Sequence, residues 1–323
     1  MGFVLLLFLY FLLIAVCLIA FLVMQLSNTN GELRLFRVLF PPRRQRTVPW
    51  GISAIPLVLA IFLLTSVQSY WFVSWTVPDT FDFAQDENTV TQEPNDHAVP
   101  NEDLRDQHPL TILMQKSGRD PIVILVCFLA AVIVAPLTEE FLFRVVIQGG
   151  IEASLRRGLG RDSAMTRRAP IVLTALFFAG IHFRPQTEPN IDYLFKAITA
   201  NMIGMLTTVA VTLVLFRCLF RIRWSDIGLR DFRRIGRDAL GALLLQLAIV
   251  IPIGIVSFAV QTLAKSDGAT RLGLSVSMVD PIPLFLFALV IGTLYDRTRR
   301  LASVFFLHAF FNLYSFLILL YSV

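Results

Sequence analysis

The sequence carries little charge for its length. Only 16% of its 323 residues are Asp, Glu, Lys or Arg, whereas 56% are hydrophobic. Soluble globular chains average about 25% charged residues, so most of this chain does not belong to that class. The mean hydropathy of +0.69 and the repeated apolar runs, each near the ~20 residues that cross a bilayer, indicate an integral membrane protein.

Cysteine and histidine are also scarce. The three cysteines, Cys17, Cys127 and Cys218, lie in or beside apolar runs, and their spacing matches neither a disulfide framework nor a zinc site. We therefore expect them to be packing residues. Of the four histidines, two lie in a polar loop, and the other two, His182 and His308, lie inside apolar runs.

The net charge is +5, with a calculated pI of about 9.4. A basic balance can indicate nucleic-acid binding, but in a membrane protein it more commonly reflects arginines in cytoplasmic loops. We therefore expect the lipid bilayer, and no nucleic acid, as a partner.

The pattern of apolar runs predicts an all-α fold, a polytopic helical bundle with about eight transmembrane helices. The first run lacks the basic flank of a cleaved signal peptide, so we expect it to be retained. The eight predicted spans are 3–25, 50–72, 121–143, 169–184, 196–219, 239–263, 281–295 and 301–321.

The loops between these runs alternate in charge. Arginine-rich segments at 27–48, 152–168, 217–237 and 296–300 alternate with the acidic segment 73–120 and with weakly charged loops. By the positive-inside rule the arginine-rich segments face the cytoplasm, so both termini are expected outside. The acidic segment has little periodicity and is expected to be an external polar loop.

Three short motifs place polar side chains inside this apolar sequence. They read EEFLFR, FFAGIHF and HAFFN, and their members are Glu139, Glu140, Arg144, Phe178, His182, His308 and Asn312. A charged side chain at mid-membrane costs about 2.5–3.5 kcal/mol on insertion scales, so such residues mark function. Residues four apart share a helix face, so Glu140 and Arg144 are expected to pair.

This set of side chains suits peptide hydrolysis. A carboxylate and a histidine beside one water can act together as a general base. A second histidine and an amide can donate hydrogen bonds to the oxyanion of a tetrahedral intermediate. If Arg144 pairs with Glu140 and holds it ionised, Glu139 remains available to act in catalysis, because its side chain points about 100° away on the helix.

In this order the motifs resemble the EExxxR, FxxxH and (H/N)xxxN motifs of the CPBP family. That family contains the type II CAAX prenyl proteases and the bacteriocin-processing and abortive-infection proteins. The stretches APLTEEFLFRVVIQGGIEA and PIPLFLFALVIGTLYDRTRRLASVFFLHAFFNLYSF extend the resemblance. It implies an intramembrane glutamate endopeptidase that cleaves a membrane-associated protein or a lipidated or hydrophobic peptide. It also implies a bacterial inner-membrane location, with the site toward the cytoplasm.

The resemblance also implies roles for individual residues. Glu139 and His182 would activate the water. His308 and Asn312 would form the oxyanion hole. The remaining three residues would orient or pack the site: Glu140, Arg144 and Phe178.

We expect two parts in the chain. Residues 1–120 would form two N-terminal spans and the acidic loop, and residues 121–323 would form the catalytic membrane domain. The second and third motifs lie unusually far apart for the family, so a two-span insertion is expected over 186–279.

The expected depths of the motif residues do not coincide. Counted at 1.5 Å per residue, His308 lies about 10 Å and His182 about 21 Å from the inner ends of their spans. Glu139 is expected near the inner end of its own span. Their convergence requires a tilt, a helix 169–184 that begins below the surface, or a break near Pro136.

Zinc is an alternative to metal-free catalysis. Glu139, His182 and His308 are residue types that bind it, but no HExxH motif is present and the resemblance implies that no metal is needed. We therefore expect no cofactor.

Two other functions stay open. A proton-coupled transporter also uses intramembrane Glu and His, although the sequence shows no internal repeat or paired broken helices. A non-catalytic membrane scaffold or immunity partner is the other alternative.

Overall fold

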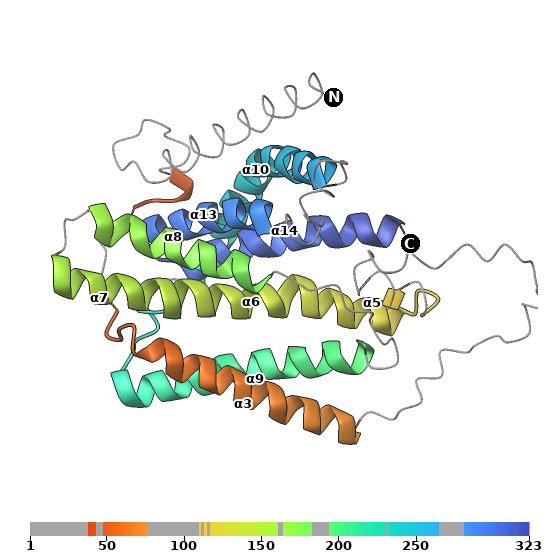
Figure 1. Cartoon of the computed structure of the whole chain (residues 1–323), viewed down its shortest axis with the longest axis horizontal. Helices are drawn as coiled ribbons and strands as arrows, with labels where there is room; N and C mark the ends of the chain where they lie inside the picture. The colour runs from red at the N-terminus through yellow and green to blue at the C-terminus, as the bar shows by residue number, and fades with distance from the viewer. Residues whose placement is uncertain are drawn as a thin grey trace, which may run out of the picture.

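The computed structural model describes residues 38–42, 48–76, 110, 113–114, 117–160, 164–182, 194–229, 232–264 and 281–322. All regular structure within them is helical (Figure 1). Five helices are long and apolar enough to cross a membrane: Ala54–Thr76, Pro121–Leu159, Leu194–Phe220, Ile235–Thr262 and Leu301–Tyr321. The predicted all-helical membrane class is therefore confirmed.

The predicted count of eight spans and the outward termini stay predictions. Run 3–25 lies outside the described residues. Runs 169–184 and 281–295 fall on two helices of 18 residues each, and neither is among the five helices that meet the length and hydropathy criteria.

One continuous helix runs through the bundle from Pro121 to Leu159. Its 39 residues span about 58 Å at 1.5 Å per residue. The carboxylate of Asp120 caps its start by accepting from the amide of Ile122 at 2.7 Å, as is usual for Asp at this position. Gly160, with φ of +83°, follows its last residue. The helix continues past residue 143, the predicted end of the span, because nothing there breaks the backbone hydrogen bonding.

Two π-helical stretches lie on either side of the paired glutamates. In chain order the helix consists of α5 (Pro121–Phe128), η3 (Leu129–Val134), α6 (Ala135–Glu140), η4 (Phe141–Gln148) and α7 (Gly149–Leu159). Short π-helical turns with i→i+5 hydrogen bonds occur frequently at functional sites. The break expected near Pro136 therefore takes the form of a wider helix that continues past the proline.

A helix pair packs along one side of the long helix. It consists of α3 (Ala54–Thr76) and α9 (Leu194–Phe220) (Figure 1). At Gly204 an added Cβ would lie 3.3 Å from the Cα of Ser66. The hydroxyls of Thr65 and Thr208 lie 2.6 Å apart. Small and hydroxylated residues allow helix backbones to approach closely in a membrane, and they join α9 to the N-terminal part of the chain.

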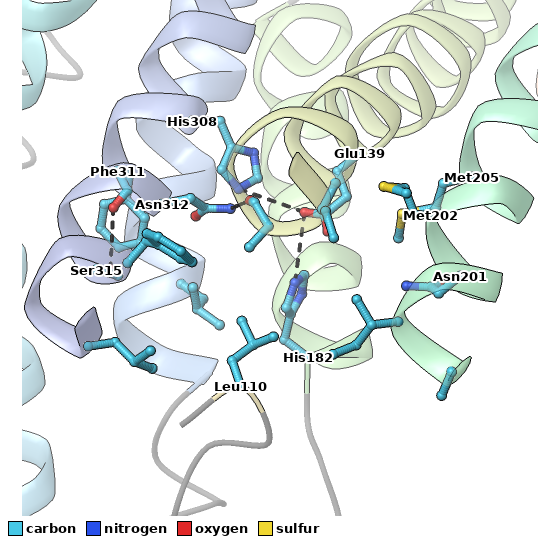
Figure 2. Close-up of a pocket in the computed structure, with 18 of the residues that line it drawn as sticks. Leu110, Glu139, His182, Asn201, Met202, Met205, His308, Phe311, Asn312 and Ser315 are labelled. Carbon is cyan, nitrogen blue, oxygen red and sulfur yellow. Dashed lines mark hydrogen bonds and ion pairs between the residues drawn. The ribbon is translucent and has the colours of Figure 1, made fainter. Parts of the chain in front are cut away.

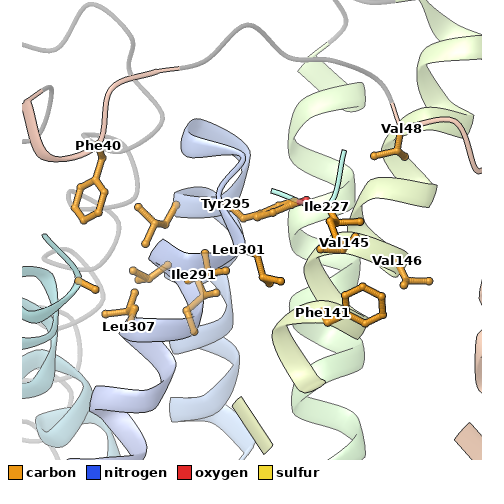
Figure 3. Packing of buried hydrophobic residues seen from close by; sticks show 14 of the residues in the cluster. Phe40, Val48, Phe141, Val145, Val146, Ile227, Ile291, Tyr295, Leu301 and Leu307 are labelled. Carbon is orange, nitrogen blue, oxygen red and sulfur yellow. The ribbon is translucent and has the colours of Figure 1, made fainter. Parts of the chain in front are cut away.

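The remaining helices cover the other side (Figure 1). They are α8 (Ala164–Ile181), α10 (Ile235–Ala264), α13 (Pro281–Thr298) and α14 (Leu301–Ser322). Phe141 and Val145 of the long helix meet Ile291 and Tyr295 of α13 and Leu307 of α14 in a buried apolar cluster (Figure 3). This packing fixes the EEFLFR motif against the helix that carries His308.

Arginines hold one end of the bundle together, and we call it the arginine end. It contains Arg156, Arg157, Arg217, Arg297, Arg299 and Arg300. Arg157 donates to the carbonyl of Trp50 at 3.0 Å, and Arg297 donates to the carbonyl of Phe40 at 3.1 Å. Arg299 pairs at 2.6 Å with Glu152.

The segments of the chain that meet at this end are also clamped to one another. Gly228, which follows α9, accepts a hydrogen bond from the amide of Leu301 at 3.3 Å. Arg300 pairs with the buried carboxylate of Asp238 in α10. Burial would lower the pKa of Arg299, but the neighbouring carboxylates of Glu152 and Asp296 raise it above its ordinary value. This end of the bundle is therefore packed and charged.

Candidate active site

A cavity of about 600 Å³ lies between the long helix, α8, α9, α13 and α14 (Figure 2). Most of its lining side chains are apolar. Five of the seven candidate residues line it: Glu139, Phe178, His182, His308 and Asn312. The other two, Glu140 and Arg144, are fully buried beside it. The fold therefore brings together three motifs that are far apart in the sequence.

Glu139 lies between the two histidines. Its Oε2 is 3.9 Å from Nε2 of His182 and 3.8 Å from Nε2 of His308, and Figure 2 shows both rings turned toward the carboxylate. These distances exceed those of direct hydrogen bonds. The side chain of Glu139 is 18% exposed. One carboxylate and two imidazoles therefore share a single point of the cavity.

A buried chain of polar contacts runs from Arg144 through Glu140 to His308. Arg144 Nε donates to Glu140 Oε2 at 3.0 Å, as the i,i+4 spacing predicts. His308 Nδ1 lies 2.8 Å from Glu140 Oε1, a contact that the sequence does not predict. Because an ionised carboxylate only accepts hydrogen bonds, this contact assigns the hydrogen to Nδ1. His308 then presents Nε2 to Glu139.

Arg144 is held in turn by its own neighbours. Its Nη1 lies 3.5 Å from Oε1 of Gln148, and Nε2 of Gln148 donates to the carbonyl of Gly292 at 3.1 Å. An added Cβ on Gly292 would lie 3.2 Å from Arg144 Nη1. The guanidinium carbon also lies 6.0 Å from the ring centre of Phe178, within the range of a cation–π contact. Gln148 and Gly292 therefore help to position the partner of Glu140.

His182 is the first residue after α8. Its Nδ1 lies 2.7 Å from the carbonyl oxygen of Phe178. A carbonyl only accepts, so Nδ1 carries the hydrogen and Nε2 faces Glu139. The Phe178 ring centre lies 4.4 Å from that of His182 and 5.9 Å from that of His308. Phe178 thus packs against both histidines.

Asn312 satisfies a carbonyl that the long helix leaves without a donor. Within η3 the amide of Ala135 bonds to the carbonyl five residues back, that of Ala130. The next carbonyl, that of Ala131, would need the amide of Pro136, and proline has none. Asn312 Nδ2 donates to Ala131 at 2.8 Å instead. This bond fixes the amide at the cavity wall and uses one of its two hydrogens.

In the structure the side chains of Glu139, His182 and His308 lie at the same level of the bundle, although their expected depths differed. Glu139 lies near the middle of a 39-residue helix, so the helix continues well beyond the residue that was expected near the inner end of its span. Helix α8, which His182 directly follows, begins at Ala164 and ends at Ile181. The side chains of Glu139 and His182 meet because α8 stops beside the middle of the long helix (Figure 1).

Helix α9 forms one wall of the cavity, and none of its residues was predicted to belong to the site. Its cavity-lining residues recur at helical spacing: Leu194, Ala197, Ile198, Asn201, Met202 and Met205. Asn201 is the only amide among them, and no hydrogen bond joins its side chain to a described residue. The sequence signal that marks it is a single amide inside the apolar run ITANMIGML. Figure 2 shows its side chain directed into the cavity.

A metal site would need at least three suitable ligands held close together. Among the residues that the structure describes, no group of three or more His, Cys, Asp or Glu side chains is arranged to hold a metal ion. Glu139, His182 and His308 would be the ligands if one bound.

Fold and site together define an integral membrane helical bundle with a carboxylate and two histidines at an intramembrane cavity. Residues 121–314 match the family described as type II CAAX prenyl endopeptidase Rce1-like, and the chain belongs to this family. No curated protein and no solved structure matches the chain. The match is a single range that includes the whole of the expected insertion 186–279, and α9 from that region lines the cavity.

Proposed function

We propose that the chain is an intramembrane endopeptidase in which Glu139 and His182 activate a water molecule to cleave a peptide bond. The observation that carries the proposal is the convergence at Oε2 of Glu139, which lies 3.9 Å and 3.8 Å from the Nε2 atoms of two histidines. A carboxylate and an imidazole at such a spacing can both contact one water and serve as its general base.

The proposed reaction has two steps. The water oxygen bonds to the substrate carbonyl carbon while its proton passes to Glu139, and the carbonyl oxygen becomes the oxyanion. The carbon–nitrogen bond then breaks, and the proton moves from Glu139, or through His182, to the leaving amine nitrogen. The apolar lining limits competing water and strengthens these electrostatic interactions.

His308 and Asn312 are proposed to stabilise the oxyanion. Because Nδ1 of His308 is bonded to Glu140, its Nε2 can donate only when the ring carries both hydrogens. That ring would then lie between the carboxylates of Glu139 and Glu140, which contact Nε2 at 3.8 Å and Nδ1 at 2.8 Å. Asn312 would donate its second amide hydrogen. Glu140 and Arg144 are proposed to hold His308 in position, without contacting the substrate.

The proposed substrate is a membrane-associated protein with a hydrophobic or lipidated segment. The lining of the cavity is largely apolar, with Asn201 and Ser315 as polar exceptions beside the motif residues. The family includes CAAX prenyl endopeptidases by its description, so prenylated peptides are the first substrates to test. Hydrophobic peptides without a lipid form the second set.

The test uses the purified full chain in proteoliposomes with a library of hydrophobic and prenylated peptides. We expect cleavage by the native chain and by Met205→Leu, a volume-conserving control in the cavity wall. Glu139→Ala and His182→Ala are expected to be inactive, and full activity in either variant contradicts the mechanism. Substrate flux across the liposome membrane without any cleavage would favour a transporter instead.

The reaction is proposed to need no metal. We expect activity to survive exhaustive chelation, and metal analysis of the purified chain to show no stoichiometric zinc. Loss of activity on chelation, with recovery on adding zinc, would assign Glu139, His182 and His308 as ligands instead.

A further inference from the structure

The cavity occupies only one half of the bundle. On the long helix its lining runs from Ala130 to Glu139, which is the part N-terminal to the buried Glu140. On α9 the lining covers Leu194–Met205, the first half of the helix, and on α14 it covers His308–Leu319, within the C-terminal two thirds of that helix. Because α9 runs parallel to the long helix and α14 runs antiparallel to it (Figure 1), these three stretches lie at the same end.

The other half is filled by side chains. Directly beyond Glu139, the side chains of Glu140, Arg144 and Val145 are 0% exposed, and that of Gln148 is 1% exposed. Ile291 of α13 packs beside them and is also 0% exposed. Within the described residues the cavity therefore extends from Glu139 away from the arginine end.

The arginine end identifies the face of the membrane. Arg156 and Arg157 lie in the last turn of the long helix, Arg217 lies in the last turn of α9, and Arg299 and Arg300 join α13 to α14. Loops rich in Lys and Arg remain on the cytoplasmic side. In the sequence, the connection 73–120 between α3 and the long helix is acidic. The arginine end is therefore cytoplasmic, and the cavity extends toward the opposite face.

We infer that the substrate reaches Glu139 from the non-cytoplasmic side of the membrane. The inference rests on the proposed function and narrows its substrate class. The scissile bond would belong to an exported or membrane-anchored protein, in a hydrophobic segment at the outer leaflet. The cytoplasmic access that the family resemblance implies would then not hold for this chain.

Cysteine labelling tests the direction of access without a known substrate. The full chain is expressed in cells after replacement of Cys17, Cys127 and Cys218 by Ala. Ser315→Cys then reports on the cavity and Trp224→Cys on the arginine end. Ser315 lines the cavity, and Trp224 is 62% exposed in the loop after α9. A membrane-impermeant methanethiosulfonate is added to intact cells and, separately, to permeabilised cells.

We expect Ser315→Cys to be labelled in intact cells and Trp224→Cys only after permeabilisation. Labelling of Trp224→Cys in intact cells reverses the orientation and overturns the inference. Failure of Ser315→Cys to react in intact cells also overturns it. Leu319→Cys, near the end of α14, is a second cavity reporter if the first variant does not accumulate. Val214→Cys, an exposed apolar position on α9, controls for reaction within lipid.

The result is independent of proteolysis. If the purified chain cleaves no peptide, the proposed function fails while the labelling still reports where the cavity opens. If the chain cleaves peptides and the reporter in the cavity reacts only from the cytoplasm, the inference alone fails. In an active chain, attachment of the impermeant label to Ser315→Cys from outside is expected to reduce cleavage at least tenfold.

Discussion

Glu139 and Glu140 are neighbours in the sequence, but the helix directs their carboxylates into different surroundings. Glu139 faces the cavity and is partly exposed, whereas Glu140 has no exposed surface and bonds both Arg144 and His308. A partly exposed carboxylate can exchange protons with a water and a substrate. A buried carboxylate between two partners serves better as a fixed charge.

Substituting each glutamate by glutamine is expected to separate these roles. Glu139→Gln removes the proposed general base, so cleavage should fall by about 10²–10⁴ with little change in the thermal unfolding midpoint. Glu140→Gln leaves the charge of Arg144 buried without its counter-ion, which typically costs about 3–5 kcal/mol. It should therefore lower both the midpoint and the activity. Peptide cleavage and thermal unfolding in one detergent measure the two effects.

The double replacement Glu140→Gln with Arg144→Met provides the control. It removes both charges, so part of the lost stability should return, while the support of His308 by an ionised carboxylate remains absent. A stable but slow enzyme is the expected result. Equal unfolding midpoints for Glu139→Gln and Glu140→Gln would contradict the assignment of roles.

Asn201 is expected to contribute to substrate binding. Its amide faces the cavity across from Glu139 and has no hydrogen-bonding partner among the described residues. Asn201→Leu keeps a similar volume and removes one polar contact, worth about 0.5–1.5 kcal/mol. We expect KM for the cleaved peptide to rise about two- to tenfold with kcat nearly unchanged. Met202→Leu is the matched control, and a fall in kcat alone would argue against a binding role.

Five of the seven motif residues could be singled out in the sequence because charged and imidazole side chains are conspicuous in apolar runs. Phe178 and Asn312 were singled out by their four-residue spacing from His182 and His308. Sequence reasoning did not find Asn201 or Gln148, since a single amide on an apolar helix is compatible with ordinary packing. It also did not predict the bond between His308 and Glu140. That contact depends on which helices are neighbours, and spacing within one motif does not contain this information.

At the scale of the element, the long helix shows what hydropathy can and cannot predict. The apolar run marks where the chain enters lipid, and its beginning at Pro121 agrees with the prediction. The helix continues to Leu159 through the charged Glu152 and Arg156, because backbone hydrogen bonding does not depend on side-chain polarity. The π-helical stretches were not predicted either, although the proline gave their approximate position.

A double-mutant cycle is expected to show that Asn312 compensates for Pro136. Asn312→Ala leaves the carbonyl of Ala131 unpaired, at a cost of about 1–3 kcal/mol. Pro136→Ala restores a backbone N–H that can donate to this carbonyl. In the Pro136→Ala background, Asn312→Ala should therefore lower the unfolding free energy by about 1 kcal/mol less than it does in the native chain. Unfolding free energies of the native chain, both single variants and the double variant give the coupling.

Additive effects of the two substitutions would contradict this account. They would mean that the carbonyl of Ala131 finds no new partner when the proline is removed. A cycle with Ser315→Ala in place of Asn312→Ala is the control. Ser315 bonds within its own helix to Phe311, so its coupling to Pro136 should be close to zero.

At the scale of the molecule, the apolar runs predicted most helices but not how they are joined. The runs 196–219, 239–263 and 301–321 correspond closely to α9, α10 and α14, because each run is long enough to cross a bilayer. The expected insertion 186–279 was inferred from the motif spacing and from two additional apolar runs in that region. In the structure its helices contribute a cavity wall and the partner of Arg300. Packing against the rest of the bundle is not encoded in the length of a segment.

Gly228 is expected to be essential for joining this region to the helices of the candidate site. It adopts a φ of +80°, and an added Cβ would lie 2.6 Å from the amide nitrogen of Leu301. Both the left-handed backbone, at about 1–2 kcal/mol for a non-glycine residue, and the clash oppose Gly228→Ala. We expect the unfolding free energy to fall by at least about 2 kcal/mol, as measured by thermal unfolding of the full chain.

Gly158→Ala is the matched control, because an added Cβ at that helical position meets nothing within 4 Å. Its stability should rise by up to about 1 kcal/mol. If region 186–279 packs as part of one bundle, Gly228→Ala should lower a single unfolding transition. An insertion that folds separately would instead unfold in a transition of its own and leave the unfolding of the helices of the candidate site unchanged. The number of transitions therefore decides whether α9 and α10 unfold together with the helices of the candidate site.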